Sequence, residues 1–175
     1  MKALTWHLAH GLLLVFLACV VGGTAIGASG VGGAPSPDAA VRWSALLRPA
    51  AGSKSLVTVE LSGDVQAGWH VYGLKQVPDG PTPLKVQLDA NPVARTAGPI
   101  SGSVPERKFD PSFGRTTEFY SAPFKLYLPV HLTSSTAPLG SRAVSVSVRF
   151  QSCNGEVCVP PKTVHLSVAV GAAHG

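Results

Sequence analysis

Apolar and polar residues alternate in several short runs along the chain, and this period of two is typical of β-strands that bury one face. The clearest run covers 143–151, where every second residue is apolar: Val144, Val146, Val148 and Phe150. Similar alternation predicts strands at 56–61 and 84–88. Less regular apolar runs predict the remaining strands, at 41–45, 68–73, around 94, at 124–130 and at 163–170.

These runs also predict the fold class. Proline has no backbone N–H, so the run that contains Pro129 is expected near a sheet edge or a bulge. Nineteen glycines and fifteen prolines favour many turns, and no stretch after the N-terminal segment has the period of a helix longer than one turn. About seven or eight short strands without helices predict an all-β fold, an immunoglobulin-like antiparallel β-sandwich.

The first residues have the layout of a secretory signal. Lys2 supplies positive charge, 12–21 is an apolar core too short to span a bilayer, and small residues follow. We therefore expect an exported or periplasmic protein. The expected division is a signal peptide at 1–28, a linker at 29–37, a domain at 38–171 and a tail at 172–175.

Composition and charge exclude some functions. Hydrophobic residues make up 45% of the chain and charged residues 13%, which is not the composition of a disordered chain. The formal net charge of +5 becomes +4 if Lys2 leaves with the signal. Because no basic cluster is interleaved with aromatic residues, we expect no nucleic-acid partner.

The cysteines carry the candidate chemistry. Cys19 leaves with the signal or, since Leu17-Ala18-Cys19 weakly resembles a lipoprotein box, becomes a lipid anchor. Cys153 and Cys158 remain, separated by an Asn-Gly turn and followed by a double proline. Export to an oxidising compartment favours a disulfide between them, and opposed positions on a hairpin are close enough for one. From these residues alone, the disulfide is either a local staple or a redox switch.

A metal site is a third reading of the cysteines, and we do not favour it. His70, His131 and His165 fall on separate predicted strands. A zinc site needs four ligands, usually with closer cysteine spacing. We expect neither a metal nor another cofactor. Residues 108–120 are predicted to be a loop that carries several aromatic side chains, and such a loop usually covers something.

Four motifs in order resemble the periplasmic N-terminal domain of DsbD, the thiol:disulfide interchange protein. They are Gly68–Tyr72, the Phe-Asp-Pro-Ser-Phe-Gly segment at 109–114, Thr117–Tyr120, and Gln151–Pro161 with its two cysteines. The resemblance covers about residues 38–171. It implies an immunoglobulin-like sandwich that takes electrons from a membrane-embedded DsbD-type reductase. The electrons pass to periplasmic thioredoxin-like proteins, including one of cytochrome c biogenesis.

The resemblance also implies roles for residues. Cys153 and Cys158 are the redox pair, with Cys158 bonded to the partner and Cys153 resolving the mixed disulfide. The implied cap over the pair is Phe109, Asp110, Phe113 and Gly114, with Phe113 as the lid. Near-site candidates are Tyr72, His70, Glu118 and Phe119, of which Phe119 is the weaker lid candidate and His70 stands where another aromatic residue is common.

Acidic residues near the cap have two readings. Asp110 and Glu118 can raise a nearby thiol pKa or accept a proton. Alternatively, Asp110 only begins an Asp-Pro turn, which is the reading we favour. Glu156, between the cysteines, is expected to be solvated.

The sequence departs from the family pattern in two ways. The cysteine spacing is one residue shorter than in the best-known member. The chain ends at Gly175 without a transmembrane electron carrier or a C-terminal thioredoxin domain, so the donor is expected to be another chain. Whether the module acts as an enzyme is open. The competing class is a non-enzymatic binding or structural sandwich with a passive disulfide.

Overall fold

A computed structural model describes residues 40–53, 55–90, 92–133 and 142–171. The expected signal peptide, with Cys19, and the linker lie outside these residues. The described part has eleven strands, more than expected, and it has no helix that could span a membrane. The strands are β1 (Val41–Pro49), β2 (Leu56–Val65), β3 (His70–Tyr72), β4 (Lys85–Leu88), β5 (Ala94–Thr96), β6 (Ser101–Gly102), β7 (Glu106–Asp110), β8 (Arg115–Tyr120), β9 (Phe124–Leu132), β10 (Ala143–Cys153) and β11 (Cys158–Ala169).

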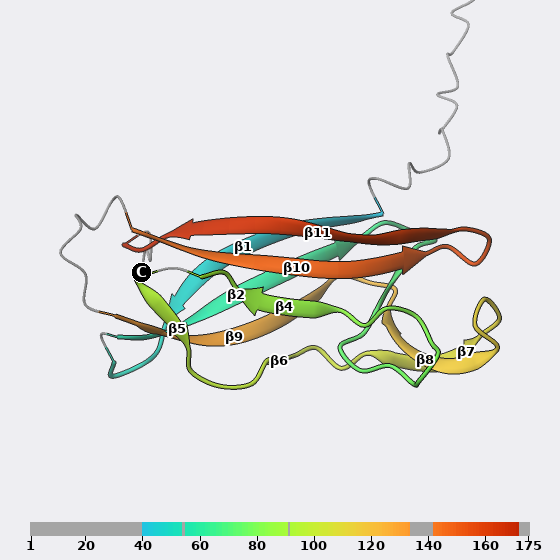
Figure 1. The fold of residues 1–175 in the computed structure, drawn as a ribbon, viewed down its shortest axis with the longest axis horizontal. Helices are drawn as coiled ribbons and strands as arrows, with labels where there is room; N and C mark the ends of the chain where they lie inside the picture. The colour runs from blue at the N-terminus through green and yellow to red at the C-terminus, as the bar shows by residue number, and fades with distance from the viewer. Residues whose placement is uncertain (1–39, 54, 91, 134–141, 172–175) are drawn as a thin grey trace, which may run out of the picture. The chain divides into compact units, whose positions relative to one another are not determined.

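The strands form two antiparallel sheets, so the predicted fold class, an all-β immunoglobulin-like sandwich, is confirmed (Figure 1). Sheet A has the order β1-β2-β9-β5, with β6 also paired to β9. Sheet B has the order β11-β10-β3-β8-β7, with β4 also paired to β10. Side chains of both sheets meet in one main core, which includes Val59 and Leu61 of β2 and Val146 and Val148 of β10.

The predicted alternation in β10 is confirmed. Val144, Val146, Val148 and Phe150 are buried, whereas the residues between them are partly or fully exposed. β10 lies inside sheet B, between β11 on one side and β3 and β4 on the other. Its period of two therefore reflects one face on the main core and one face turned outward.

The prediction of a loop at 108–120 is wrong. These residues belong to the hairpin of β7 and β8, and only 111–114 form the turn. The Asp-Pro and Phe-Gly pairs that indicated a loop are confined to that turn. β7 is an edge strand with exposed residues on both faces. It therefore lacks the apolar alternation that identifies a half-buried strand.

The predicted placement of Pro129 near an edge or bulge is also wrong, because β9 is interior to sheet A. Pro129 opposes Thr58 of β2, and its carbonyl oxygen accepts a hydrogen bond from the Ala97 N–H (2.9 Å). The N and O atoms of one strand residue point to the same side. The backbone nitrogen of Pro129 therefore points to the side of β9 where β5 and β6 pair. Pro129 lies at the break between these two short strands, so its lack of an N–H costs no hydrogen bond of the ladder.

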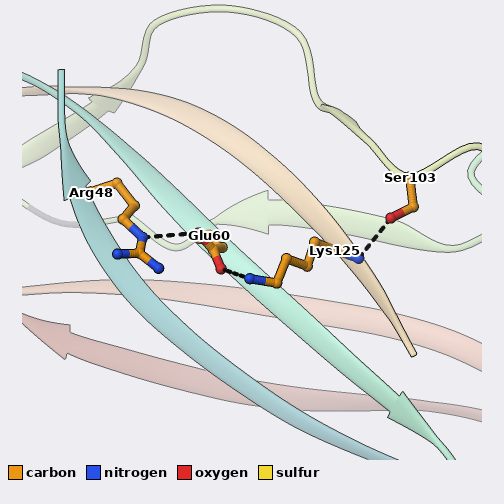
Figure 2. Close-up of polar contacts among 4 residues, drawn as sticks. All are labelled: Arg48, Glu60, Ser103 and Lys125. Carbon is orange, nitrogen blue, oxygen red and sulfur yellow. Dashed lines mark hydrogen bonds and ion pairs between the residues drawn. The ribbon is translucent and has the colours of Figure 1, made fainter. Parts of the chain in front are cut away.

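A buried carboxylate on the outer face of sheet A is paired with two exposed cations (Figure 2). Glu60 is only 5% exposed, although its neighbours in β2 point into the core. Its carboxylate accepts hydrogen bonds from Arg48 Nε (2.9 Å) and Lys125 Nζ (2.5 Å). These two hydrogen bonds hold the pKa of Glu60 below its usual range, and the bond from Lys125 has the larger effect. Burial has the opposing effect. The backbone N–H of Lys125 donates to Ser103 Oγ (3.0 Å).

Candidate functional site

A β-bulge in the last hairpin brings the two cysteines to one face of sheet B. The β10–β11 register is regular as far as Phe150↔Lys162, and it resumes at Ser152↔Val159. Two steps along β10 thus match three steps along β11, so the extra residue lies within Pro160–Pro161. Without it, strict alternation would place Cys158 on the core face of the sheet and Cys153 on the outer face.

The prediction that the last strand begins near Thr163, after a proline-closed loop, is therefore wrong. β11 begins at Cys158 and contains both prolines. It can do so because β11 is an edge strand and the prolines occupy the bulge, which are the two positions where a sheet tolerates proline.

The turn between the cysteines is fixed by Asn154 and Gly155. The Asn154 side-chain oxygen accepts hydrogen bonds from the backbone N–H groups of Glu156 (3.0 Å) and Val157 (2.8 Å). Gly155 has φ of 90°, a conformation that strains other residues. Cys153 and Cys158 form the expected disulfide across this hairpin, with their Cα atoms 4.1 Å apart. Glu156 is exposed, as expected of a solvated side chain.

The disulfide lies in a small cluster separate from the main core. Its buried members are Tyr72, Phe119 and Cys153, and Phe113 and Cys158 pack against them. The strand registers pair Tyr72 with Phe119, and His70 with Cys153, so these side chains share the outer face of sheet B. The β10–β11 loop and the β7–β8 turn lie at the same end of the domain (Figure 1).

The two sulfur atoms differ in access to solvent. Cys153 is 0% exposed, whereas Cys158 is partly exposed. The pair is therefore asymmetric: an incoming protein can reach Cys158 more easily than Cys153.

Tyr72 links the disulfide to Asp110. Its hydroxyl oxygen is 2.8 Å from Asp110 Oδ2 and 3.1 Å from Cys153 Sγ. The phenol has a single hydrogen, and a carboxylate is the stronger acceptor, so the hydrogen is donated to Asp110. The lone pairs of the Tyr72 oxygen then face the sulfur. Burial first, and then the hydrogen bond and charge of Asp110, raise the pKa of Tyr72 far above its usual range.

Asp110 fixes the turn, as the favoured reading predicted, and it also contacts side chains of the disulfide cluster. Its Oδ1 accepts from the Ser112 backbone N–H (2.9 Å) and so fixes the turn. Its Oδ2 accepts from Tyr72 and from Thr117 Oγ1 (3.4 Å). The carboxyl group is buried, at 5% exposure. Sequence reasoning missed Thr117, which is buried beside Asp110 and lies seven positions further along the chain.

The aromatic residues of the expected cap take different positions. Phe113 lies in the turn, with its ring 5.6 Å from the Tyr72 ring in an edge-on contact. Phe109 is 63% exposed and is not among the residues packed around the disulfide. Phe119, the weaker lid candidate, is buried in the cluster. Gly114 ends the turn with φ of 61°.

His70 and Glu118 lie on opposite faces of sheet B. The His70 ring contacts the rings of Tyr72 (5.0 Å between centroids) and Phe119 (4.8 Å). Burial lowers the pKa of His70, and the charges of Asp110 and Glu106 oppose that shift. Glu118 precedes Phe119 in β8 and so points away from the disulfide, where it pairs with Arg107 (3.7 Å).

The described residues hold no group of three or more His, Cys, Asp or Glu side chains that could bind a metal ion. His165 of β11 pairs with Asp89 (3.2 Å), and His131 lies in β9 of the other sheet. The chemistry that the site offers is therefore that of its disulfide, hydroxyl, carboxylate and imidazole groups.

Comparison with known proteins identifies similar domains. A family model described as the N-terminal part of thiol:disulfide interchange protein DsbD matches residues 37–169. The chain is similar to the reduced N-terminal domain of DsbD from Neisseria meningitidis, with 19% identity over 77% of this chain and 89% of that one, at a TM-score of 0.49. It is similar to the N-terminal periplasmic domain of ScsB from Proteus mirabilis, with 18% identity over 78% and 49% of the two chains, at a TM-score of 0.48. No curated protein sequence matches the chain.

Proposed function

The chain belongs to the family of DsbD N-terminal domains, and from this premise we propose that it is a thiol–disulfide exchange module. It relays electrons through Cys153 and Cys158 in the periplasm. The donor is a membrane-embedded DsbD-type reductase, and the acceptors are thioredoxin-like proteins. The observation that carries the proposal is the setting of the disulfide: it sits outside the main core, against a buried tyrosine–carboxylate pair.

A passive staple does not need this setting. The cysteines are five positions apart and a hydrogen-bonded turn already joins them, so the disulfide closes a small ring. The chain-entropy estimate for a ring of this size is about 2 kcal/mol, at the low end of the usual range. Burying the carboxyl group of Asp110 against Tyr72 offsets part of that gain, because buried charges are costly to desolvate. The arrangement therefore favours reactivity over stability.

The difference in exposure supports a separate role for each cysteine. The Cys158 thiolate attacks the partner disulfide; a Cys158–partner bond forms, and one partner sulfur leaves as a thiolate. The Cys153 thiolate then attacks Cys158; the Cys153–Cys158 bond forms, and the second partner sulfur leaves. Two electrons pass to the partner, and the protons of the two thiols pass to its sulfur atoms.

Tyr72 and Asp110 protect the reduced state in this scheme. With its hydrogen donated to Asp110, the Tyr72 oxygen offers Cys153 only lone pairs, so it can accept a hydrogen bond from a thiol but cannot donate one to a thiolate. The negative charge of Asp110 also disfavours a second negative charge nearby. Because the thiolate is the species that oxidants attack, both effects slow unwanted oxidation of Cys153.

Phe113 acts as the lid in the same scheme. It projects from the β7–β8 turn against the cluster that holds Cys158. Movement of this turn uncovers Cys158 for a partner, while Phe119 and Tyr72 stay in the sheet beneath it.

A redox titration tests the proposal. We expect a reduction potential above about −300 mV, the value below which structural disulfides usually lie. We also expect Cys153→Ala to trap a mixed disulfide with a thioredoxin-like protein through Cys158. Cys158→Ala is the matched control and should trap far less, because its remaining cysteine is buried. A disulfide that resists reduction to well below −300 mV, or a Cys153→Ala variant that traps no partner, contradicts the proposed function.

A further inference from the structure

We infer that His70 accepts the proton of the Cys153 thiol when Cys153 resolves the mixed disulfide. This inference rests on the proposed function and adds a residue to it. Cys153 must become a thiolate before it can attack, and the groups that hold it as a thiol, Tyr72 and Asp110, oppose that step.

The strand register places His70 beside Cys153. The two residues are directly opposed on β3 and β10. Opposed side chains on antiparallel strands share a face, with Cβ atoms about 4.5–5.5 Å apart. The imidazole and the sulfur therefore share one face of sheet B, which is also the face of Tyr72.

The Nε2 atom of His70 is buried without a hydrogen-bond partner among the described residues. Buried polar atoms are normally satisfied, and an exception calls for an explanation. Tyr72 and Phe119 contact the ring and limit its orientations. In the oxidised state the adjacent sulfur has no hydrogen to donate. Reduction creates an S–H donor on the residue directly opposed to His70, and Nε2 can accept this hydrogen.

The charges around His70 suit a proton acceptor. Burial lowers the pKa of His70, so the ring is neutral at neutral pH and can accept a proton. Imidazole is ordinarily a much stronger base than a carboxylate and is better matched to a thiol. Once protonated, the ring is stabilised by the negative charges of Asp110 and Glu106. Besides His70, the titratable and charged residues that the strands carry on this face of the sheet are Tyr72, Lys85, Glu106, Lys108, Asp110, Arg115, Arg149, Cys153, Cys158 and His165.

The step can be followed with 5,5′-dithiobis(2-nitrobenzoate) and the reduced protein at equal concentrations. Attack by Cys158 forms a mixed disulfide and releases one nitrothiobenzoate; attack by Cys153 then forms the Cys153–Cys158 bond and releases the second. In the wild type the second phase should slow as the pH falls through the pKa of His70. In His70→Phe, which keeps an aromatic ring, the second phase should be at least about tenfold slower at pH 7 and should lose this inflection.

The controls separate this inference from the proposed function. The first phase should be unchanged in His70→Phe, and both phases should be unchanged in His165→Phe, whose ring is exposed on β11. An unchanged second phase and pH profile in His70→Phe overturns the role of His70 and leaves the exchange module standing. Reduced wild-type protein that releases no nitrothiobenzoate overturns both.

A measurement on the wild-type protein does not depend on how the variant folds. The titration of His70 is followed by NMR in the oxidised and reduced protein. A Cys153 S–H bond to Nε2 favours neutral imidazole, so the pKa of His70 should fall by about half a unit or more on reduction. The same midpoint in both states overturns the inference.

Discussion

The two carboxylates that are buried in the described part of the chain, Glu60 and Asp110, have opposite surroundings. Both are 5% exposed, and they lie on the outer faces of different sheets. Glu60 sits between the cations Arg48 and Lys125 (Figure 2). Asp110 is held by the Tyr72 and Thr117 hydroxyls and one backbone N–H. Among the ion pairs of the described residues, none includes Asp110.

The difference in surroundings indicates that Glu60 has a structural role and that Asp110 serves the site. The charge of Glu60 is compensated, so its burial ties β1, β2 and β9 together. Among the described residues Asp110 has no cation within ion-pair distance, so its charge acts on its neighbours, Tyr72 and the sulfur beyond it. A buried acid without a cation is unfavourable for stability alone, and such groups concentrate at functional sites. Asp110 is therefore expected to affect reactivity, and Glu60 stability.

The largest effect is expected from a change that destroys the disulfide cluster and leaves the Glu60 cluster intact. Deleting Pro161 removes the extra residue of the bulge, so Cys158 turns to the core face and cannot reach Cys153. We expect both cysteines to be free in a thiol assay under denaturing conditions, with no exchange activity. Pro161→Ala keeps the residue count and should keep the disulfide. A deletion variant that still forms the disulfide shows that the bulge does not place Cys158.

The next effect is on stability alone. Glu60→Gln removes the buried charge that two cations contact, and we expect a loss of about 2 kcal/mol in unfolding free energy at pH 7. The folded pKa of Glu60 is lowered, so its contribution is full above the unfolded pKa and is lost as the pH falls through the folded pKa. Denaturant melts of wild type and variant should therefore converge only below the folded pKa of Glu60, which lies below the usual range of a glutamate carboxyl group. Equal stabilities at pH 7, or a slower nitrothiobenzoate reaction in the variant, contradict the structural role.

Asp110→Asn should show the reverse pattern. The amide can still accept hydrogen bonds from Tyr72 and Ser112, but it carries no charge. Loss of that charge lowers the pKa of the Cys153 thiol, so in a Cys158→Ala background the alkylation of Cys153 at pH 7 should rise about tenfold, one pKa unit. Glu60→Gln in the same background is the matched control. If the alkylation rate does not change, Asp110 only stabilises the turn and does not affect the thiol.

The smallest effect concerns the lid. Phe113→Ala should raise the rate at which iodoacetamide alkylates Cys158, measured in a Cys153→Ala background. We expect roughly a threefold increase, because Cys158 is already partly exposed and the ring covers only part of its approach. Phe109→Ala removes an exposed ring from the same hairpin and should leave the rate unchanged. Equal rates in both variants contradict a lid at Phe113.

Local patterns were sufficient for much of the fold. The alternation of Val144, Val146, Val148 and Phe150 predicted a strand with one buried face, because a period of two follows from strand geometry alone. Two cysteines beside an Asn-Gly turn predicted the hairpin and its disulfide for the same local reason. The ordered motifs from Gly68 to Pro161 gave the family.

The remaining features depend on contacts between distant residues. The sequence presents Pro160 and Pro161 as the end of a loop; only pairing with β10 shows that they form a bulge that turns Cys158 to the outer face. Asp110 looks like a turn residue, because nothing local reveals a tyrosine 38 positions earlier whose hydroxyl it binds. The sequence therefore determined that the chain carries a hairpin disulfide. The tertiary structure decided which groups surround it, because burial and charge at a site are set by the strands that meet there.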